Sequence, residues 1–422
     1  MFIIYDLIFF LISLVYLPVY LLRKKFHRGF LSRLGILPKK LDLNRPIWIH
    51  AVSVGEAMAI SGLVSELRIA HPEQKFVIST VTATGNKVAR GFAGKGDFVT
   101  YLPLDFSFFV RMVIDRINPS LFIIAETEIW PNLISYLGKK NIPVLTVNGR
   151  LSDSSFRGYL SIKFLVSRIL KKVSLFCMQT PRDAERLINL GVDEKRIQVT
   201  GNMKFDAKAN VNYKKDSLDY RKKLNLDPSE SLLVAGSTHP GEEEIILNIY
   251  QRLLKDFPKL KLLIAPRHPE RSQEVERLIN KAGLQAVRVS RLPGVPVKRE
   301  EIFILDTVGD LVSYYAISDL VFVGGSLVKK GGHNIIEPAS VEKPVLFGPF
   351  MFNFRDIAEL FLANKAAIKI QGQQELYLEI RDLLKNKDKR ERLAQAAKQL
   401  IQKNQGATKR NAELIRELIK IA

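Results

Sequence analysis

Short apolar stretches rich in Ile, Val and Leu alternate with amphipathic segments along the first half of the chain. The stretches predict strands at 47–54, 76–82, 99–105, 121–127, 143–149 and 175–180. Helical patterns at 55–70, 85–92, 107–117 and 131–140 separate most of them. Apolar strands that are separated by helices are typical of a parallel sheet with helices on both faces. We therefore expect a doubly wound α/β domain here.

The pattern breaks at a polar stretch, residues 203–230, and then begins again. The second half predicts strands at 232–238, 260–266, 286–290, 302–306, 320–325 and 344–348, with helices at 241–256, 272–282, 309–318 and 334–342. Two Rossmann-like domains joined by a polar segment are the simplest architecture. Residues 374–422 read as charged helix, which either is solvated or packs back across the domains.

The N-terminus is apolar from residue 1 to residue 22, with Asp6 and Ser13 as the polar exceptions. Basic residues follow up to residue 40, with no acidic residue among them. This order predicts a membrane helix whose basic flank stays in the cytoplasm, and it is the reverse of a signal peptide. A helix lying in the membrane interface is the alternative, because Asp6 and Pro18 interrupt the apolar run.

The composition indicates the size of the cores and the charge of the binding partners. The 422 residues are 47% hydrophobic and 25% charged, which suits two packed domains. Lys and Arg outnumber Asp and Glu by 64 to 43, a net charge of +21 that favours nucleic acid, anionic lipid or a phosphorylated substrate. The single cysteine, Cys177, excludes an internal disulfide and a Cys-rich metal site, and we expect it to be buried.

Several common catalytic motifs are absent. The sequence has no Gly-x-x-x-x-Gly-Lys-Ser/Thr, no Gly-x-Gly-x-x-Gly after the first strand, no Gly-x-Ser-x-Gly and no His-Glu-x-x-His. Six histidines are scattered singly, and no aspartates are spaced as Asp-x-Asp. The sequence therefore predicts a mechanism without a metal or other cofactor, and it offers no nucleic-acid motif.

Polar residues cluster at strand ends in the second half. The stretch 323–339 places two Gly pairs before a helix that we expect to begin near His333 or Asn334, where backbone N–H groups favour an anion. Glu337, one turn in, suits sugar hydroxyls or merely stabilises the helix start. Arg267 ends another strand and suits a phosphate or base. The stretch 234–244 is a third strand end of this form, and three in one domain indicate a nucleotide pocket.

Acidic residues occupy the corresponding places in the first half. Glu56 follows the strand 47–54, and Glu126 and Glu128 lie at the end of the strand 121–127. Two carboxylates that reach one site from different strands suit general-base catalysis, since each raises the pKa of the other. Lys204 follows a further strand and could neutralise a carboxylate or phosphate. For each residue alone, a helix cap, an ion pair or an exposed lysine is the ordinary alternative.

These stretches together resemble the Kdo (3-deoxy-D-manno-octulosonic acid) transferases, membrane-associated GT-B glycosyltransferases of Gram-negative bacteria. The matching motifs are HAVSVGE, AETEIWPNLI, TGNMKFD, GSTHPGEEE, APRHPER, DTVGDL, FVGGSLVKKGGHNIIEPA and GPFMFNF, in the family's order and spacing. The resemblance covers essentially the whole chain. It implies two Rossmann-like domains that face a central cleft, with an anchor at 1–43, an acceptor domain at 44–206 and a donor domain at 207–422.

The resemblance also implies the reaction. Such an enzyme moves Kdo from CMP-Kdo to the 6'-hydroxyl of lipid IVA, with inversion, on the cytoplasmic side of the inner membrane. Glu56 matches the catalytic base, and Glu126 and Lys204 match residues that stabilise the transition state. The implied donor contacts are Ser237, Thr238, His239, Pro266, Arg267, Val308, Gly309, Asp310, Gly332, His333, Asn334, Ile335, Ile336 and Glu337.

Three points qualify this reading. Asp310 stands where the family pattern has Glu, which puts a carboxylate contact to CMP in doubt but not a backbone one. The basic stretch 157–172 and the aromatic stretch 105–109 are candidates for contact with lipid or acceptor, or else pack against the core. A GT-B enzyme or epimerase that uses a UDP-sugar is the alternative function.

Overall fold

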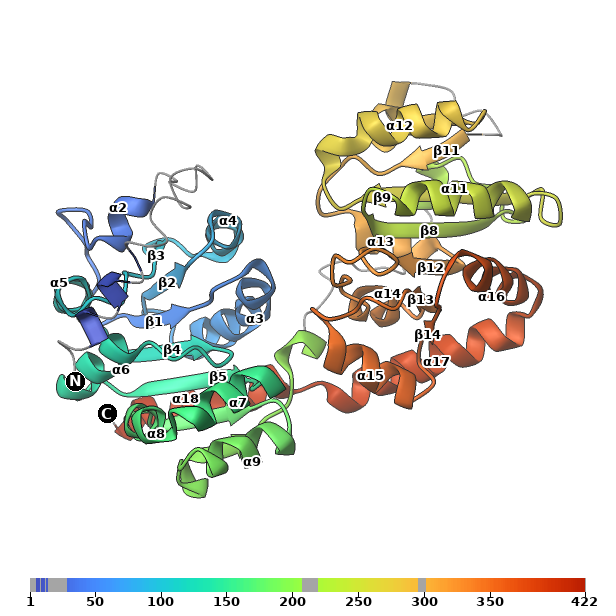
Figure 1. Cartoon of the computed structure of the whole chain (residues 1–422). Coiled ribbons are helices and arrows are strands. Elements are labelled where there is room, and N and C mark those ends of the chain that lie inside the picture. The colour runs from blue at the N-terminus through green and yellow to red at the C-terminus, as the bar shows by residue number, and fades with distance from the viewer. Residues whose placement is uncertain are drawn as a thin grey trace. The chain divides into compact units, whose positions relative to one another are not determined.

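The computed structural model describes residues 5–7, 9–11, 13, 29–206, 219–294 and 301–421 (Figure 1). Contacts divide the chain into two compact units: unit 1 comprises Met1–Ala207 and Asn404–Ala422, and unit 2 comprises Lys208–Lys403. Within the described ranges each unit contains one seven-stranded sheet, and all the strand pairs are parallel. The predicted pair of parallel α/β domains is confirmed.

The sheet of unit 1 has the strand order β3-β2-β1-β4-β5-β6-β7. Its strands are β1 Ile47–His50, β2 Phe76–Thr80, β3 Phe98–Tyr101, β4 Leu121–Ala125, β5 Val144–Gly149, β6 Leu175–Met178 and β7 Ile197–Val199. Its helices are α2 Phe30–Arg33, α3 Val54–Ala70, α4 Ala83–Phe92, α5 Ser107–Ile117, α6 Pro131–Lys139, α7 Asp153–Ser161, α8 Lys163–Leu170, α9 Pro181–Asn189 and α18 Ala407–Ile421, with 3-10 turns η1 Glu194–Arg196 and η2 Met203–Asp206.

Helices cover both faces of this sheet, which explains why its strands are apolar throughout. Trp48 and Phe122 point into a core shared with α5, α6, α8 and α9. Ile49 and Ile123, the next residues along the same strands, point into a core shared with α3, α4 and α18. Successive side chains on a strand face opposite sides, so both sets are buried. Cys177 is buried as predicted, and burial raises the pKa of its thiol to about 12.

The C-terminal helix α18 belongs to unit 1, whereas the domain prediction placed all of 207–422 in the second domain. Ile415 is fully buried in the core beside α3. The Asp206 carboxylate accepts the backbone N–H groups of Gly406 and Thr408, each at 2.6 Å, and so caps the start of α18. The charged tail was expected either to be solvated or to pack back across the domains. The helix α18 packs back, against the first domain.

The sheet of unit 2 has the strand order β10-β11-β9-β8-β12-β13-β14. Its strands are β8 Ser231–Thr238, β9 Leu260–Pro266, β10 Gln285–Arg288, β11 Glu301–Ile304, β12 Leu320–Val323, β13 Val345–Phe347 and β14 Ile368–Lys369. Its helices are α11 Glu242–Leu253, α12 Ser272–Lys281, α13 Leu311–Ile317, α14 Ile336–Ser340, α15 Arg355–Ala363, α16 Gln373–Lys385 and α17 Lys387–Asn404, with 3-10 turns η3 Pro269–Arg271 and η4 Val289–Gly294. Side chains of α11, α12 and α16 form the core on one face of this sheet.

Two details of unit 2 differ from the prediction. The expected helix 334–342 is shorter, because the Asn334 side chain accepts the N–H of Ile336 at 3.0 Å and α14 begins only there. The short edge strand β14 and helix α15 were not predicted, since a two-residue strand has no periodic pattern to detect.

Most of the apolar segment 1–22, for which a membrane anchor was predicted, lies outside the described residues. Among the ranges that are described, no helix is long and apolar enough to cross a membrane. The Asp6 carboxylate accepts the N–H of Ser107 at 3.1 Å and the side-chain N–H of Asn132 at 2.7 Å. Tyr5 stacks on Phe9, whose ring also packs edge-on against Phe106. Asp6 therefore has polar partners in unit 1.

Candidate functional site

The acidic residues of unit 1 lie at the point where the strand order of its sheet reverses. The chain builds outward from β1 to β2 and β3, then returns to add β4 on the other side of β1. Ligands of doubly wound sheets bind at the carboxyl ends of the strands that flank such a point. The strands β1 and β4 are neighbours (Figure 1). Glu56 follows β1 and Glu126 follows β4, so the fold brings these two predicted residues to the expected place.

Glu56 stands in the first turn of α3 and is 9% exposed. Its carboxylate accepts the N–H of Val52 at 2.7 Å and the hydroxyl of Ser53 at 2.8 Å, while the Ser53 side chain caps the N–H of Glu56 at 3.4 Å. The residue is thus part of a helix cap. Burial above all, then the negative charge of Glu126, raises the pKa of Glu56 to about 7. The pKa is raised although Glu56 stands at a helix start, because desolvation outweighs the two hydrogen bonds.

Glu126 and Lys204 form an ion pair beside Glu56. The Lys204 Nζ donates to Glu126 Oε1 at 3.0 Å, and both side chains are about one-quarter exposed, at 22% and 25%. The turn η2 positions Lys204, because Met203 donates its N–H to the Asn148 side chain at 2.9 Å. The structure therefore brings together all three predicted catalytic residues. Glu128 lies close enough for its charge also to raise the pKa of Glu56.

The backbone of Glu126 is strained. Its φ of +59° lies in the left-handed region, which costs a residue with a side chain on the order of 1 kcal/mol. Its N–H donates to Val147 O at 2.9 Å on β5, so the sheet holds it in this conformation. Strained residues of this kind cluster at functional sites. The outlier marks Glu126 independently of its charge.

The aromatic stretch 105–109 divides into an interior and an exposed part. Asp105 is buried and accepts the N–H groups of Asn132 and Leu133, so it caps α6. Burial raises the pKa of Asp105 to about 7. Phe108, in contrast, is 67% exposed. A lipid or acceptor contact is therefore available to Phe108 and not to Asp105.

The predicted donor residues of unit 2 gather at the equivalent point of its sheet, where β8 and β12 are neighbours. His239 follows β8 and approaches His333, with 2.9 Å between their Nε2 atoms. Arg267 follows β9, donates its N–H to Thr238 O at 2.9 Å and is exposed. Burial raises the pKa of Glu337, and the Asn334 hydrogen bond and the Arg267 charge oppose that change. Three strand-end segments that are distant in sequence thus meet in one place.

Other predicted donor residues serve local structure. The Asn334 side chain donates to Glu337 Oε1 at 3.1 Å, so this carboxylate is already bonded within its loop. In the turn before α13, Val308 is 86% exposed and Gly309 has a φ of +104°, which favours glycine. The Asp310 carboxylate accepts the Thr307 hydroxyl at 2.6 Å. The backbone of this turn is therefore exposed, whereas the carboxylate of Asp310 is bonded within the turn.

The most important residue that the sequence analysis missed is Glu242, which is fully buried next to this cluster. It stands in the sequence GEEE at the start of α11. An acid at a helix start is ordinary, and three in a row give no sign of which ones are buried, although Glu242 and Glu243 both are. Only the tertiary structure distinguishes Glu242 from Glu244, which is exposed and caps Gly241.

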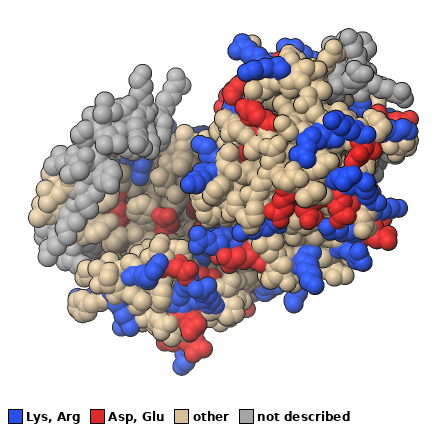
Figure 2. Space-filling model, turned by 45° about the vertical axis from the view of Figure 1, so that its right-hand side comes forward, with Lys and Arg blue, Asp and Glu red and all other residues tan. Residues whose placement is uncertain are grey.

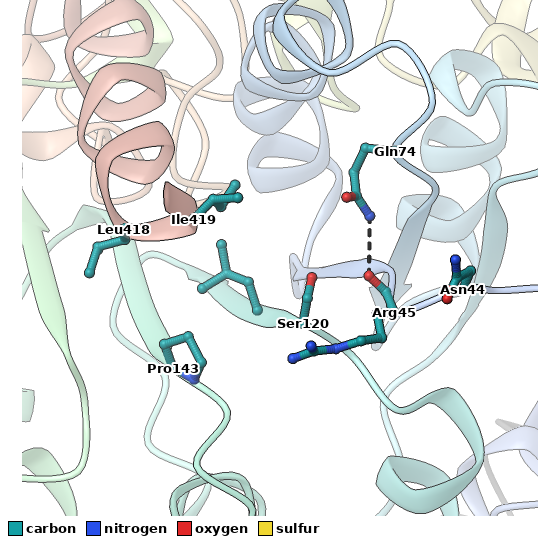
Figure 3. Close-up of a pocket in the computed structure, with 8 residues that line it drawn as sticks. Asn44, Arg45, Gln74, Ser120, Pro143, Leu418 and Ile419 are labelled. Carbon is teal, nitrogen blue, oxygen red and sulfur yellow. Dashed lines mark hydrogen bonds between the residues drawn. The ribbon is translucent and has the colours of Figure 1, made fainter. Parts of the chain in front are cut away.

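A cavity of about 290 Å³ lies elsewhere in unit 1, at the amino ends of the strands (Figure 3). Gln74 donates to Arg45 O at 3.2 Å across its wall. It is lined by Asn44, Arg45, Gln74, Ser120, Leu121, Pro143, Leu418 and Ile419. These residues precede β1, β2, β4 and β5 or end α18, so the cavity is on the edge opposite Glu56. Among the described residues, no group of three or more His, Cys, Asp or Glu could hold a metal ion.

Known proteins resemble the chain in both parts. Residues 28–207 match the family described as 3-Deoxy-D-manno-octulosonic-acid transferase (kdotransferase), and residues 297–400 match Glycosyl transferases group 1. The 3-deoxy-D-manno-octulosonic acid transferase of Haemophilus influenzae is 36% identical over 371 residues, which cover 88% of this chain and 86% of that protein. The protein of the same name from Rickettsia felis is 34% identical over 339 residues, covering 80% of this chain and 71% of that protein.

A solved structure agrees on the fold. The UDP-GlcNAc 2-epimerase of Neisseria meningitidis, bound to UDP-GlcNAc, superposes with a TM-score of 0.61 and 14% identity, covering 88% of this chain and 100% of that one. At this identity the likeness supports the GT-B type of fold and nothing more specific. The relatives from Haemophilus and Rickettsia decide the family: the chain belongs to the 3-deoxy-D-manno-octulosonic acid (Kdo) transferases, which are glycosyltransferases.

Proposed function

We propose that this enzyme transfers Kdo from CMP-Kdo to the 6'-hydroxyl of lipid IVA, with inversion and without a metal. The acceptor oxygen forms a bond to the anomeric carbon of Kdo, and its proton passes to the Glu56 carboxylate. The bond from that carbon to the CMP phosphate breaks, and CMP leaves as an anion. One base and a site for negative charge are sufficient for this step.

The observation that carries the proposal is Glu56, whose pKa of about 7 is that of a base poised near neutral pH. The environment of Glu56 supports this role. The charged group with the largest effect on its pKa is another acid, Glu126, whose negative charge disfavours a permanent charge on Glu56. The ion pair of Glu126 with Lys204, at 3.0 Å, holds a cation close to the same site. Lys204 is the side chain best placed to stabilise negative charge during transfer.

Donor binding falls to unit 2 in this proposal. Arg267 supplies a positive charge at a strand end, and Glu337 and Asn334 supply hydrogen-bonding groups beside it. The Val308–Gly309 backbone is exposed and suits a nucleotide contact that does not need the Asp310 carboxylate. This arrangement answers the doubt raised by Asp310, because the shorter acid keeps its own partner, Thr307.

Acceptor binding falls to unit 1, at a membrane surface. On α7, α8 and the turn between them, Leu160, Ile162, Phe164 and Leu165 are exposed apolar residues. Exposed basic residues lie among them, and the Arg168 guanidinium lies 4.0 Å from the centre of the Phe164 ring. Apolar side chains mixed with cations suit the headgroup region of an anionic bilayer. Over the face in Figure 2, by contrast, Lys and Arg are interspersed with Asp and Glu.

The deciding experiment incubates the protein with CMP-Kdo and lipid IVA and measures the mass of the lipid. We expect the mass of one or more Kdo residues to be added, in the presence of EDTA as well as without it. The Glu56→Gln variant controls for contaminating activity. A product formed only from a UDP-sugar, or epimerisation of UDP-GlcNAc, would establish the alternative instead.

The membrane part of the proposal has its own test, which is sedimentation with vesicles. We place the protein on the cytoplasmic side of the inner membrane, anchored through residues 1–22. We expect binding to vesicles that contain phosphatidylglycerol and weaker binding when Phe164 is changed to Ser. The matched control is Ile188→Ser, which changes an exposed apolar residue (43%) on α9 instead. Equal binding by both variants would show that α8 does not contact the membrane.

A further inference from the structure

The Glu242 carboxylate ties together two loops of unit 2. Its Oε2 accepts the backbone N–H groups of His239 at 3.0 Å and Gly325 at 2.7 Å. Its Oε1 accepts those of Ser326 at 3.0 Å and Leu327 at 2.9 Å. Burial raises the pKa of Glu242, and these four N–H groups oppose that change. Because each oxygen already accepts two N–H groups, the observed contacts require the ionised carboxylate.

The loop after β12 would otherwise be an anion site. Successive N–H groups that point into one concavity bind phosphate in many proteins, and Gly325 has the positive φ, +66°, that such loops need. Here the concavity is filled by a side chain of the same molecule. A Cβ at Gly324 would come within 2.6 Å of Ser237 O and 2.9 Å of Glu242 Oε2, so the closure leaves no room for a larger residue. A donor phosphate has to bind elsewhere in this unit.

The same contacts position two histidines. Glu242 holds the N–H of His239, and Gly325 accepts the N–H of Gly332, the residue before His333, at 2.8 Å. The two imidazole rings are parallel within 5°, with centroids 5.1 Å apart and Nε2 atoms 2.9 Å apart. Two Nε2 atoms can form a hydrogen bond only if one carries a proton and the other a lone pair. The rings therefore have opposite tautomers.

Both rings are neutral at pH 7. Burial, reinforced by nearby positive groups that include Arg267, lowers the pKa of His239 to about 4 and that of His333 to about 3. With opposite tautomers, one ring keeps an N–H at Nδ1 and the other keeps a lone pair there. The pair thus offers one donor and one acceptor, on the two outer Nδ1 atoms. A hydroxyl group can donate and accept, so it can bind at either of them.

We propose that Glu242 is a positioning residue for donor binding: it closes the Gly325–Leu327 loop to phosphate and holds His239 against His333, so that the pair binds a hydroxyl group of the donor. The inference rests on the proposed function for the identity of the donor. The negative charges of that donor then fall to Arg267. Both the ribose and the Kdo sugar carry hydroxyl groups, so the test has to separate them.

The first experiment determines the tautomers of His239 and His333 in the wild-type protein without any ligand. With 15N-labelled histidine, the six rings give separate NMR signals. We expect two neutral rings of opposite tautomer, linked by a nitrogen–nitrogen coupling across the shared proton. Two rings of the same tautomer, or a protonated ring at pH 7, would overturn the proposal. This outcome does not depend on the reaction, so it is distinguishable from a failure of the proposed function.

The second experiment compares Glu242→Gln with Glu244→Gln. In Glu242→Gln, the amide NH₂ group faces two of the backbone N–H groups that the carboxylate accepted. Glu244 is the matched control, because its carboxylate accepts only the N–H of Gly241, at the surface. We expect Glu242→Gln to lose the coupled histidine signals and to raise KM for CMP-Kdo about tenfold, with kcat changed less. Glu244→Gln should match the wild type. Wild-type KM with an intact coupling in Glu242→Gln would overturn the assignment.

A third variant keeps the test decisive if Glu242→Gln does not fold. His239→Asn leaves the Glu242 carboxylate and its N–H contacts in place and removes one ring. We expect weaker binding of CMP-Kdo than in the wild type, with an unchanged unfolding temperature. If the variant weakens CMP but not 2'-deoxy-CMP, the hydroxyl is the 2'-hydroxyl of the ribose, and if it weakens both, the hydroxyl is elsewhere on the nucleotide. If it weakens CMP-Kdo but not CMP, the hydroxyl is on Kdo. Unchanged affinity of His239→Asn for CMP and for CMP-Kdo would refute the role of the pair.

Discussion

Replacing Glu56 with Gln separates the two roles that the structure gives to this residue. If Glu56 is chiefly a helix cap, the loss of its charge destabilises unit 1. If it is a catalytic base kept in an unfavourable environment, the substitution abolishes transfer and stabilises the fold. The amide is nearly the same size, and it can still accept the N–H of Val52 and donate to the Ser53 hydroxyl, so packing changes little.

The expected gain follows from the pKa. A pKa of about 7 in the folded state, against an ordinary value of 4.5, corresponds to about 3 kcal/mol. Between these two values the folded protein binds more protons at Glu56 than the unfolded chain does. Stability therefore falls as pH rises through this window, and the deficit is complete above pH 7. The Gln variant has no such deficit, so its advantage should grow from near zero at pH 4 to at most about 3 kcal/mol at pH 8.

Tryptophan fluorescence during urea unfolding measures this directly. The chain has two tryptophans, Trp48 and Trp130, and both lie in unit 1, so the signal reports the unit that contains Glu56. Unfolding curves at pH 4.5 and pH 8 give the difference between variant and wild type at each pH. A Glu56→Gln protein that is less stable than the wild type at pH 8, or that retains substantial transfer, would falsify the assignment of Glu56 as the base.

Four further experiments test related conclusions. Below pH 7 the kcat/KM of the wild type should fall about tenfold per pH unit as Glu56 is protonated, and a rate that is flat to pH 5 contradicts this. Lys204→Met should reduce kcat about 100-fold and change unfolding by less than about 1 kcal/mol, because its ion pair is partly exposed. Arg267→Ala should weaken CMP binding at least about tenfold by calorimetry, with no loss of stability. Asp206→Ala should cost about 2 kcal/mol and speed hydrogen exchange in α18; unchanged exchange there would show that the cap is unimportant.

The sequence predicts the layers of both units because their strands are buried on two faces. Trp48 and Ile49 point to opposite cores, so no alternation of polar residues marks the strand, and the apolar run itself is the signal. The place of α18 has no such signal. Its apolar stripe fits any buried surface, and only the contacts of Asp206 with Gly406 and Thr408 show which unit it joins.

The site was predictable in position and less so in its chemistry. Residues at the carboxyl ends of β1 and β4 have to meet, because topology decides which strands flank the switch point. The pKa of Glu56 depends instead on how completely the carboxylate is desolvated, and a helix start gives the opposite expectation. The left-handed backbone of Glu126 is equally invisible in sequence, since Glu has no preference for positive φ.

Glu56 and Glu242 show why a buried acid at a helix start is ambiguous until its partners are known. Both stand in the first turn of a helix after the first strand of their unit, and both are at least nine-tenths buried. Glu242 accepts four backbone N–H groups, which stabilise its ionised form and oppose the rise in pKa that burial causes. Glu56 accepts one N–H and one hydroxyl and has acids as neighbours. The same position in the fold thus gives a carboxylate held by four N–H groups in unit 2 and one with fewer hydrogen-bond partners in unit 1, and the second is the one suited to accept a proton as a base.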